Sequence, residues 1–257
     1  MTAPVYELSN LCYPAKGTPI LADATLAIPG ESFTAILGAN GAGKSTLLRL
    51  LAGHAPDYSG SIQMFGEPLG QLSGREWARR IGYLPQFHEP AFALPVGEVV
   101  LTGRAAFAGL MPGRDDRERA RAAMAEVGIE HLAHRPYTEI SGGERQLVRL
   151  ARLVAQDPRV VLLDEPIAHL DLANQVRLLE VLRALVRAGR AVVAVLHDLN
   201  LAFRFSDHCV FLRAGRVAIP DQLPATTDFL REIFGVEIGR IGEGRDAMYF
   251  PKPKEST

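Results

Sequence analysis

Residues 38–46 read Gly-Ala-Asn-Gly-Ala-Gly-Lys-Ser-Thr, which matches the pattern G-x-x-x-x-G-K-[ST]. The apolar residues 33–37 before this stretch are typical of a strand, and the leucines after it repeat at helical spacing until Gly53. Glycines let successive backbone N–H groups approach phosphate oxygens, and the start of the following helix adds partial positive charge. The stretch therefore predicts a strand, a phosphate-binding loop and a helix.

Individual roles within this loop follow from side-chain chemistry. Lys44 is expected to reach the β- and γ-phosphates of a nucleotide, and the Ser45 hydroxyl is expected to bind Mg²⁺. A chance glycine-rich turn is the alternative, but it does not explain the strand before the loop and the helix after it. The residues predicted to bind nucleotide here are Gly38, Asn40, Gly41, Gly43, Lys44, Ser45 and Thr46.

A second candidate lies at residues 160–165, which read Val-Val-Leu-Leu-Asp-Glu. A continuous apolar run of this length predicts a strand that is buried on both faces, and an α/β sheet binds ligands at the carboxyl ends of its strands. Asp164 is then suited to hold Mg²⁺ through water, and Glu165 to act as general base toward the γ-phosphate. Taken alone, residues 160–165 could equally be an ordinary strand end with polar residues. Together with the phosphate loop, the catalytic interpretation is favoured.

A second glycine-rich motif, Ser141-Gly142-Gly143-Glu144, begins a helix with apolar periodicity. As S-x-x-E it predicts a capping box, which by itself explains a stable helix start. It does not explain two adjacent glycines, because each weakens helix propensity by roughly 1 kcal/mol relative to alanine. Bare N–H groups at a helix N-terminus predict a second anion site instead.

The rest of the chain alternates strands with helices, which predicts an α/β fold with a mostly parallel sheet and a β-rich N-terminal part. From about residue 88 the pattern becomes helical, and the charge run 114–121 is expected to be a solvated helix face. The remaining predicted strands are residues 61–65, 81–84 and 191–196, and the remaining predicted helices are 172–188 and 228–234.

Composition excludes several classes of protein. The chain has 257 residues, 47% of them hydrophobic, and a net charge of −1, so a broad basic field for nucleic acid is absent. Arg145, Arg149 and Arg152 are expected to form a solvated helix face. Two cysteines are too few for a disulfide framework, and they favour a reducing compartment. Without a leader or a spanning stretch, the protein is expected to be soluble or held at a membrane by partners.

Other nucleotide and metal sites are disfavoured. None of the four asparagines is followed by lysine, so the guanine-binding pattern N-K-x-D of GTPases is missing. His131 and His134 have the spacing H-x-x-H without further metal ligands nearby, and they are expected to lie on a helix surface.

With these motifs in this order, the chain resembles the ATP-binding cassette (ABC) ATPases over nearly its whole length. Gly38–Thr46 resembles the family's Walker A loop, residues 160–165 Walker B, and Ser141–Glu144 the signature motif. Further matched positions are Gln86 as the Q-loop, Leu170-Asp171 as the D-loop, His197 as the switch histidine, and Tyr13 as the aromatic that stacks on adenine. Ile140, Glu144 and Ile167 differ from the residues that are commonest in the family.

The resemblance implies a P-loop NTPase core with a mostly parallel sheet, an antiparallel N-terminal β subdomain and an inserted α-helical subdomain. Residues 1–257 would form one ABC domain, with the helical insertion at about 88–155 and a C-terminal extension at about 220–257. The implied cofactors are ATP and Mg²⁺, with Ser45, Gln86 and Asp164 as the metal site and Glu165, His197 and Gln86 in catalysis. It also implies a head-to-tail homodimer, in which each ATP lies between one Walker A loop and the partner's signature motif.

Within the family, three kinds of protein are possible. Non-transport ABC ATPases of translation or DNA repair usually carry two cassettes or a long coiled coil, and this chain has neither. A regulatory module without turnover is disfavoured by Glu165 and His197. An energising subunit of an importer is therefore expected, peripheral at the cytoplasmic face of the inner membrane, with integral permease subunits and a substrate-binding protein as partners and no nucleic acid.

The same resemblance extends to the importer group for metal chelates. The stretches around Gln86, Asp171 and His197 are similar to importers of iron–siderophore complexes, haem and cobalamin, while Pro-Gln-Phe at 85–87 leans toward molybdate or tungstate importers. The permease is expected to dock beside Gln86, and the apolar candidates for that contact are Phe87, Phe92, Phe107 and Leu110.

Overall fold

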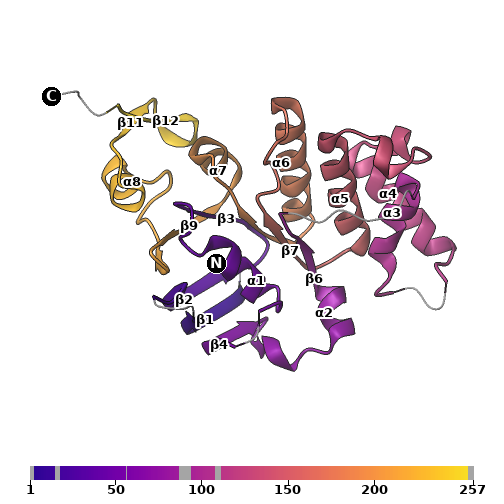
Figure 1. Cartoon of the computed structure of the whole chain (residues 1–257), viewed down its shortest axis with the longest axis horizontal. Helices are drawn as coiled ribbons and strands as arrows, with labels where there is room; N and C mark the ends of the chain where they lie inside the picture. The colour runs from indigo at the N-terminus through magenta and orange to yellow at the C-terminus, as the bar shows by residue number, and fades with distance from the viewer. Residues whose placement is uncertain (1–2, 15–17, 56, 87–93, 108–110, 254–257) are drawn as a thin grey trace. The chain divides into compact units, whose positions relative to one another are not determined.

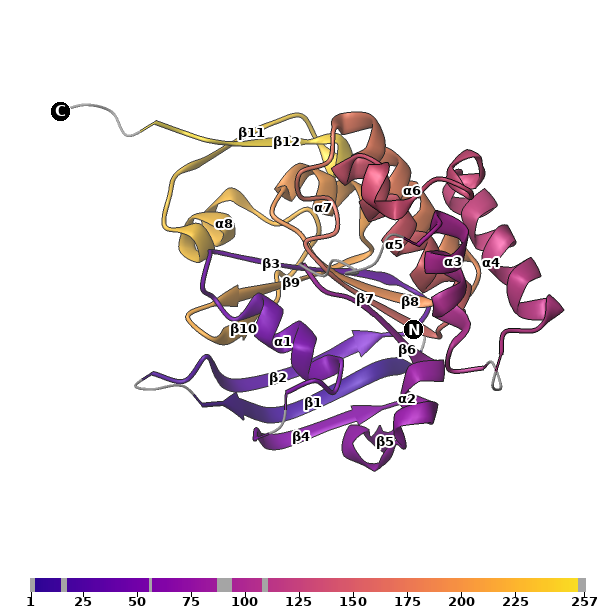
Figure 2. The same cartoon turned by 45° about the vertical axis from the view of Figure 1, so that its right-hand side comes forward.

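The computed structural model describes residues 3–14, 18–55, 57–86, 94–107 and 111–253. The chain divides into two compact units, one made of residues 1–71 and 193–257 and the other of residues 72–192. Figures 1 and 2 label the helices and strands of both units.

The first unit contains an antiparallel sheet with the strand order β2-β1-β4-β5. Buried and exposed side chains alternate along parts of β1 and β2, where Leu8, Ala24 and Leu26 are buried between exposed neighbours. The strands are β1 (Pro4–Tyr13), β2 (Leu21–Pro29), β4 (Ser59–Met64) and β5 (Glu67–Pro68). The predicted antiparallel N-terminal part is confirmed.

Strand β3 (Phe33–Gly38) of the same unit is buried along its whole length and runs parallel to β9 (His208–Arg213). β10 (Arg216–Ala218) pairs with β9 in the antiparallel sense. After β3 the chain turns through the glycine loop into α1 (Lys44–Leu51). The predicted strand–loop–helix arrangement is confirmed.

The C-terminal part of the first unit adds a helix and a ribbon. α8 (Thr227–Phe234) confirms the helix predicted at 228–234, and Gly235 ends it at φ 71°. β11 (Ile238–Ile241) and β12 (Met248–Pro251) form an antiparallel pair that the sequence analysis did not predict. The unit's other helical segments are α7 (Leu199–Phe205), η1 (Leu69–Gln71) and η5 (Gly244–Asp246).

The second unit combines a parallel strand pair with helices. β6 (Ile81–Leu84) and β7 (Val160–Asp164) lie side by side in register, with Leu84 opposite Leu163. Strand β8 (Ala191–Val195) begins in this unit and ends in the first. The helices are α2 (Gly74–Arg80), α3 (Val96–Leu101), α4 (Arg114–Val127), α5 (Gly142–Gln156) and α6 (Leu172–Arg187), with short 3₁₀ turns η2 (Thr102–Arg104), η3 (Glu130–Leu132) and η4 (Tyr137–Glu139). The parallel pairs in both units confirm a mostly parallel α/β core.

The prediction of a solvated arginine face on α5 is wrong for two of its three residues. Arg152 is exposed, but Arg145 and Arg149 are half-buried. Arg145 donates to the Thr138 carbonyl, and Arg149 donates to the Pro85 carbonyl and to Gln146 Oε1. These guanidinium groups bind backbone carbonyls outside α5, which apolar periodicity cannot reveal.

A buried hydrogen bond joins the N-terminal sheet to the end of α1. Tyr6 is fully buried, and its hydroxyl donates to the carbonyl of Leu51, the last residue of the helix, at 3.0 Å. Burial also raises the pKa of Tyr6, so the phenol remains a donor throughout the neutral range. This bond satisfies one of the carbonyls that a helix end leaves without a partner.

We expect Tyr6→Phe to lower the free energy of unfolding by about 1–2 kcal/mol, because the Leu51 carbonyl loses its donor inside the core. Chemical denaturation of the two proteins measures the difference. Tyr58→Phe is the matched control, since Tyr58 is half-exposed and should tolerate the loss of its hydroxyl. Equal losses for the two variants would contradict the role given to the Tyr6 bond.

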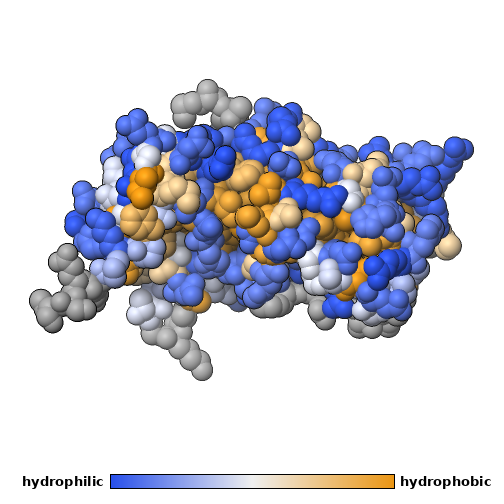
Figure 3. All heavy atoms as spheres, turned by 90° about the horizontal axis from the view of Figure 1, so that it is seen from above, coloured by the Kyte–Doolittle hydropathy of each residue, from blue (hydrophilic) through white to orange (hydrophobic). Residues whose placement is uncertain are grey.

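No helix in the described part of the chain is long and apolar enough to cross a membrane. The face drawn in Figure 3 is largely hydrophilic, with smaller apolar patches between the polar side chains.

Candidate functional site

The glycine loop is built so that only glycine fits at two of its positions. Gly38 has φ 144°, and a Cβ atom there would lie 2.2 Å from the Leu212 carbonyl oxygen of the neighbouring β9. Gly43 has φ 101°, and a Cβ would lie 2.8 Å from the Ile20 carbonyl oxygen. Gly41, at φ 76°, has open space around it. The loop is thus held close to its own unit by backbone contacts, with its middle residues exposed toward solvent.

Lys44 is the first residue of α1 and is only 6% exposed. Its Nζ donates to the carbonyl oxygens of Gly38 and Ala39, each at 2.9 Å. The loop backbone therefore holds the ammonium group at the centre of the loop, beside the N-terminus of the helix. A cation and a row of N–H groups in one place form a site for phosphate oxygens.

Two other predicted residues lie in the same unit. Tyr13 ends β1 and is half-buried. His197 is exposed and follows Leu196, whose N–H donates to the Ile36 carbonyl at 3.1 Å, two residues before Gly38. The next residue, Asp198, caps α7 by accepting from the N–H groups of Asn200 and Leu201. The backbone thereby brings the histidine segment beside the strand that leads into the phosphate loop.

In the second unit, Gln86 and Glu165 meet at the carboxyl ends of two adjacent strands. Each residue lies two positions beyond the register pair Leu84 and Leu163, so both side chains emerge at the same edge. Gln86 Nε2 donates to Glu165 Oε2 at 2.8 Å. Glu165 has φ 51°, a left-handed conformation that is uncommon outside glycine and is found at functional sites.

Asp164, the last residue of β7, is 5% exposed. Carboxylate and amide oxygens, as Asp164 and Gln86 of this unit offer, are hard ligands of the kind that Mg²⁺ prefers. The described residues contain no group of three or more His, Cys, Asp or Glu side chains that could hold a metal. Mg²⁺ usually takes one or two carboxylates together with substrate phosphates and water, so this donor set fits that ion.

The predicted capping box at the start of α5 is present. Ser141 Oγ accepts from Glu144 N at 3.2 Å, and Glu144 Oε2 accepts from Ser141 N at 2.8 Å. These hydrogen bonds lower the pKa of the Glu144 carboxyl, with smaller contributions from the charges of Arg135 and His131, so it is ionised at neutral pH. A carboxylate thus lies against the helix N-terminus.

A second capping box of the same type shows what is particular to the signature region. Ser73-Gly74-Arg75-Glu76 caps α2 in the same way. At the equivalent position the box of α2 has Arg75, whereas that of α5 has a second glycine, Gly143. A Cβ atom at Gly143 would lie 3.3 Å from Asn174 Nδ2 and 3.6 Å from Leu170 Cδ2. Gly143 therefore lets the start of α5 approach the segment that leads into α6.

That segment contains the predicted Asp171. Its carboxylate caps α6 by accepting from Asn174 N at 2.8 Å and from Asn174 Nδ2 at 2.9 Å. The structure thereby brings Gly143, Leu170, Asp171 and Asn174 together. Asn174 was not singled out from the sequence; the capping signal there is Asp171 itself, a preferred N-cap residue.

The sequence analysis also missed two residues behind Gln86 and Glu165. Gln146 Nε2 donates to the Pro166 carbonyl at 2.8 Å, and Arg149 donates to the Pro85 carbonyl. The predicted solvated face included Arg149 but not Gln146, and the spacing of three between them on one helix was the available signal.

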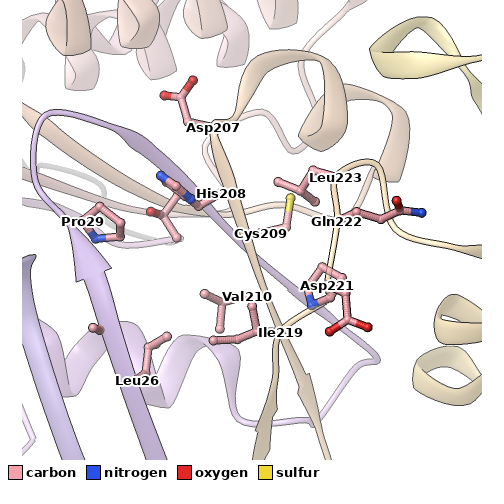
Figure 4. A pocket seen from close by; sticks show the side chains of 13 residues that line it. Leu26, Pro29, Asp207, His208, Cys209, Val210, Ile219, Asp221, Gln222 and Leu223 are labelled. Carbon is pink, nitrogen blue, oxygen red and sulfur yellow. The ribbon is translucent and has the colours of Figure 1, made fainter. Parts of the chain in front are cut away.

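A separate pocket of about 330 Å³ in the first unit contains none of the predicted site residues (Figure 4). It is lined by residues of β2 and β9 and by the segment 219–223. Cys209, whose thiol is buried there, hydrogen-bonds with Ser206, and burial raises the pKa of the thiol to about 11. At neutral pH Cys209 is therefore a protonated, weakly reactive thiol.

Known proteins resemble this chain in sequence and in structure. The ABC transporter family matches residues 21–168. The hemin import ATP-binding protein HmuV of Gloeobacter violaceus is 45% identical over 221 residues, covering 82% of this chain and 80% of that protein. HmuV of Bordetella pertussis is 40% identical over 242 residues, covering 90% and 92%.

Two solved structures share the fold. A metal-chelate type ABC transporter in an inward-facing conformation superposes with a TM-score of 0.85 at 28% identity, covering 98% of this chain and 99% of that one. A dimeric bacterial ABC transporter cassette superposes with a TM-score of 0.73 at 28% identity, covering 82% and 96%. Together with the phosphate loop, these matches decide the family: the chain belongs to the ABC transporters and is an ATP-binding protein of that family, an ABC-type ATP hydrolase.

Proposed function

We propose that this chain is the ATP-hydrolysing subunit of a hemin importer, and that two copies form head-to-tail ATP sites. The proposal is supported most directly by the hydrogen bond between Gln86 and Glu165, because the carboxylate and the amide meet at the edge where α/β sheets bind their ligands. The glycine loop with its buried Lys44 supplies the phosphate site.

In this proposal each residue has a chemical role. Lys44 and the loop N–H groups bind the β- and γ-phosphates, while Tyr13 stacks on adenine and His197 donates to the γ-phosphate. Mg²⁺ would be held by Ser45, Gln86 and Asp164, and it would neutralise charge on the phosphate oxygens. Glu165 accepts the proton of the attacking water, and the amide of Gln86 keeps the carboxylate oriented.

The signature residues would complete the site of the other copy. Ser141, Gly142 and Gly143 present a helix N-terminus, and a Cβ at Gly142 would meet nothing within 4 Å. A helix N-terminus whose first residues are glycines leaves its backbone N–H groups accessible, which suits the γ-phosphate of a partner's ATP. Asp171, beside Gly143, would lie at the same interface. The dimeric cassette with a similar fold supports this assembly.

Hemin is the proposed cargo because two relatives that resemble the chain over most of its length are hemin import ATP-binding proteins. These relatives favour a chelate importer over the non-transport ABC ATPases. Molybdate or tungstate import, toward which Pro-Gln-Phe at 85–87 leans, is the alternative. Deleting the gene in its host should abolish growth on hemin as sole iron source and leave a molybdenum-dependent enzyme activity intact. The reverse result would reject hemin.

The proposed partners are integral permease subunits and, through them, a substrate-binding protein, which would hold the chain peripherally at the cytoplasmic face of the membrane. Of the apolar residues predicted to contact the permease, Phe87, Phe92 and Leu110 lie outside the described residues. Phe107 is half-buried, and its ring is covered by the guanidinium groups of Arg79 and Arg104 at 5.1 and 4.2 Å. We therefore propose that Phe107 packs the helical region.

The rate of ATP hydrolysis per chain, measured against protein concentration, tests the shared site. With Mg²⁺ present, the rate per chain should rise with concentration toward a plateau, and a chelator should abolish it. A constant rate per chain from a protein that remains monomeric throughout would show that one chain holds a complete site.

Glu144 gives a further prediction, because its carboxylate lies where the partner's phosphate would bind. Glu144→Gln keeps a capping box but removes the charge. In a Glu165→Gln background, we expect half-maximal dimer formation at about two- to fivefold lower ATP concentration. Light scattering during an ATP titration measures it, and Glu180→Gln, an exposed charge change on α6, is the control. An unchanged midpoint would mean that the carboxylate does not compete with phosphate.

A further inference from the structure

Two side chains of α5 reach the backbone on either side of the Gln86–Glu165 pair. Pro85 precedes Gln86, and its carbonyl accepts from the Arg149 guanidinium. Pro166 follows Glu165, and its carbonyl accepts from Gln146 Nε2 at 2.8 Å. Both carbonyls lie just beyond the ends of β6 and β7, where the sheet no longer provides hydrogen-bond donors.

The two side chains also bind each other. Gln146 and Arg149 are three residues apart on one helix face, and Arg149 Nη1 donates to Gln146 Oε1 at 3.0 Å. With the bond from Gln86 to Glu165 at 2.8 Å, the contacts close a ring. The ring runs through Pro85, Gln86, Glu165, Pro166, Gln146 and Arg149, all of which are buried or half-buried.

We infer that Gln146 and Arg149 are positioning residues, which hold Gln86 and Glu165 in their catalytic orientation and connect them to the signature helix. This inference rests on the proposed function of Glu165 as the base. Ser141 begins the helix that carries both residues, so a nucleotide bound at its N-terminus would act on the base through one rigid element. In this inference, Gln146 and Arg149 act through Gln86 and Glu165 and do not contact the nucleotide themselves.

Guanidinium chemistry explains why arginine occupies position 149. The planar fork donates in two directions at once, to the Pro85 carbonyl and to the Gln146 amide. A lysine would carry the same charge, but its single ammonium group could not reproduce this planar geometry. Likewise, the Gln146 amide both accepts from Arg149 and donates to Pro166, which a carboxylate or a methionine side chain could not do.

The experiment measures turnover at saturating ATP and the KM for ATP in Arg149→Met and Gln146→Met. A misplaced base lowers the chemical rate without changing nucleotide binding, so turnover should fall by about ten- to a hundredfold with KM within about twofold of wild type. Arg149→Lys should fall between wild type and Arg149→Met. In a Glu165→Gln background, Arg149→Met should cause no further loss, because the base that it positions is already absent.

Gln156→Met is the matched control. At the other end of α5, Gln156 Nε2 donates to the carbonyls of Ala78 and Ile81 at 2.6 and 2.7 Å. This substitution therefore removes side-chain anchoring between the same helix and the start of β6, away from Glu165. It should lower the melting temperature and leave turnover unchanged. If Arg149→Met is too unstable to purify, the same measurements on Gln146→Met and Arg149→Lys test the inference.

Two results would overturn the inference. One is unchanged turnover in Gln146→Met and in the position-149 variants, and the other is a loss of turnover in Gln156→Met as large as theirs. Glu165→Gln, assayed beside them, separates this inference from the proposed function. If Glu165→Gln retains wild-type turnover, the proposed function fails first. If it loses turnover and the Gln146 and Arg149 variants do not, only the positioning role is wrong.

Discussion

Glu165→Gln is expected to reduce ATP turnover by roughly 10²–10⁴-fold while ATP binding is retained. The substitution is close to isosteric, and the new amide oxygen can still accept the hydrogen bond that Gln86 Nε2 gives to Glu165. The geometry at the ends of β6 and β7 is therefore preserved. What is lost is the negative charge that, in the proposed mechanism, takes a proton from the attacking water.

A second consequence follows from the same substitution. If hydrolysis normally reopens the dimer, a variant that binds ATP and does not cleave it should accumulate as a closed dimer. Size-exclusion chromatography with and without ATP measures this, beside a turnover assay. Glu180→Gln, which changes the charge of α6 in the same way, should behave as wild type in both assays. Turnover near the wild-type rate in Glu165→Gln would show that another group is the main base.

The parts of the fold that the sequence predicted well are those in which chemistry demands particular residue types at fixed spacing. A phosphate loop needs glycine where φ is positive and where a Cβ would collide, as at Gly38 and Gly43. A capping box needs a hydroxyl and a carboxylate three residues apart, as at Ser141 and Glu144. Such constraints are local and remain visible in one sequence.

The capping box alone did not define the signature motif, because α2 begins with the same arrangement at Ser73 and Glu76. α2 was itself not predicted, since none of its residues is buried and it therefore has no apolar periodicity. The short ribbon β11–β12 was missed for a related reason, as each strand has only four residues. Short, exposed elements leave a weak sequence pattern.

The positioning residues could not be predicted because their partners are distant in the chain. Arg149 and Pro85 are 64 residues apart, and Gln146 and Pro166 are 20 apart. Nothing in a single sequence marks a carbonyl that the sheet leaves without a donor. A charged residue on a helix is therefore interpreted as solvated until the fold places a backbone acceptor beside it.

Gly142→Asp and Lys44→Ala are each expected to reduce turnover by about 10²-fold or more. Lys44→Ala removes the cation that the loop holds beside Gly38 and Ala39. Gly142→Asp adds a carboxylate at the first position of α5, where a new side chain has open space. An acidic residue stabilises a helix N-terminus, so this variant should remain folded while it repels a partner's phosphate.

Gly74→Asp provides a matched control for the second substitution. Gly74 is the first residue of α2 and follows a serine cap in the same type of capping box, and a Cβ atom there would likewise meet nothing within 4 Å. The same carboxylate at an equivalent helix start should leave turnover near the wild-type value. If Gly74→Asp lost turnover as well, the effect of Gly142→Asp would result from adding a negative charge anywhere on the chain, and not from repulsion of a partner's phosphate.

Mixing the two inactive variants distinguishes a shared site from a site within one chain. In a head-to-tail dimer of one Lys44→Ala chain and one Gly142→Asp chain, both changes fall in one ATP site, and the other site has an intact loop and an intact signature motif. In an equimolar mixture with random pairing, about half of the dimers contain one chain of each variant, and each of these has one intact ATP site out of two. The mixture should therefore recover up to about a quarter of the wild-type rate. Each variant alone at the same total concentration is the baseline. If the mixture stays at that baseline although light scattering shows dimers, the site does not combine residues of two chains, and Ser141–Glu144 serves only to cap α5.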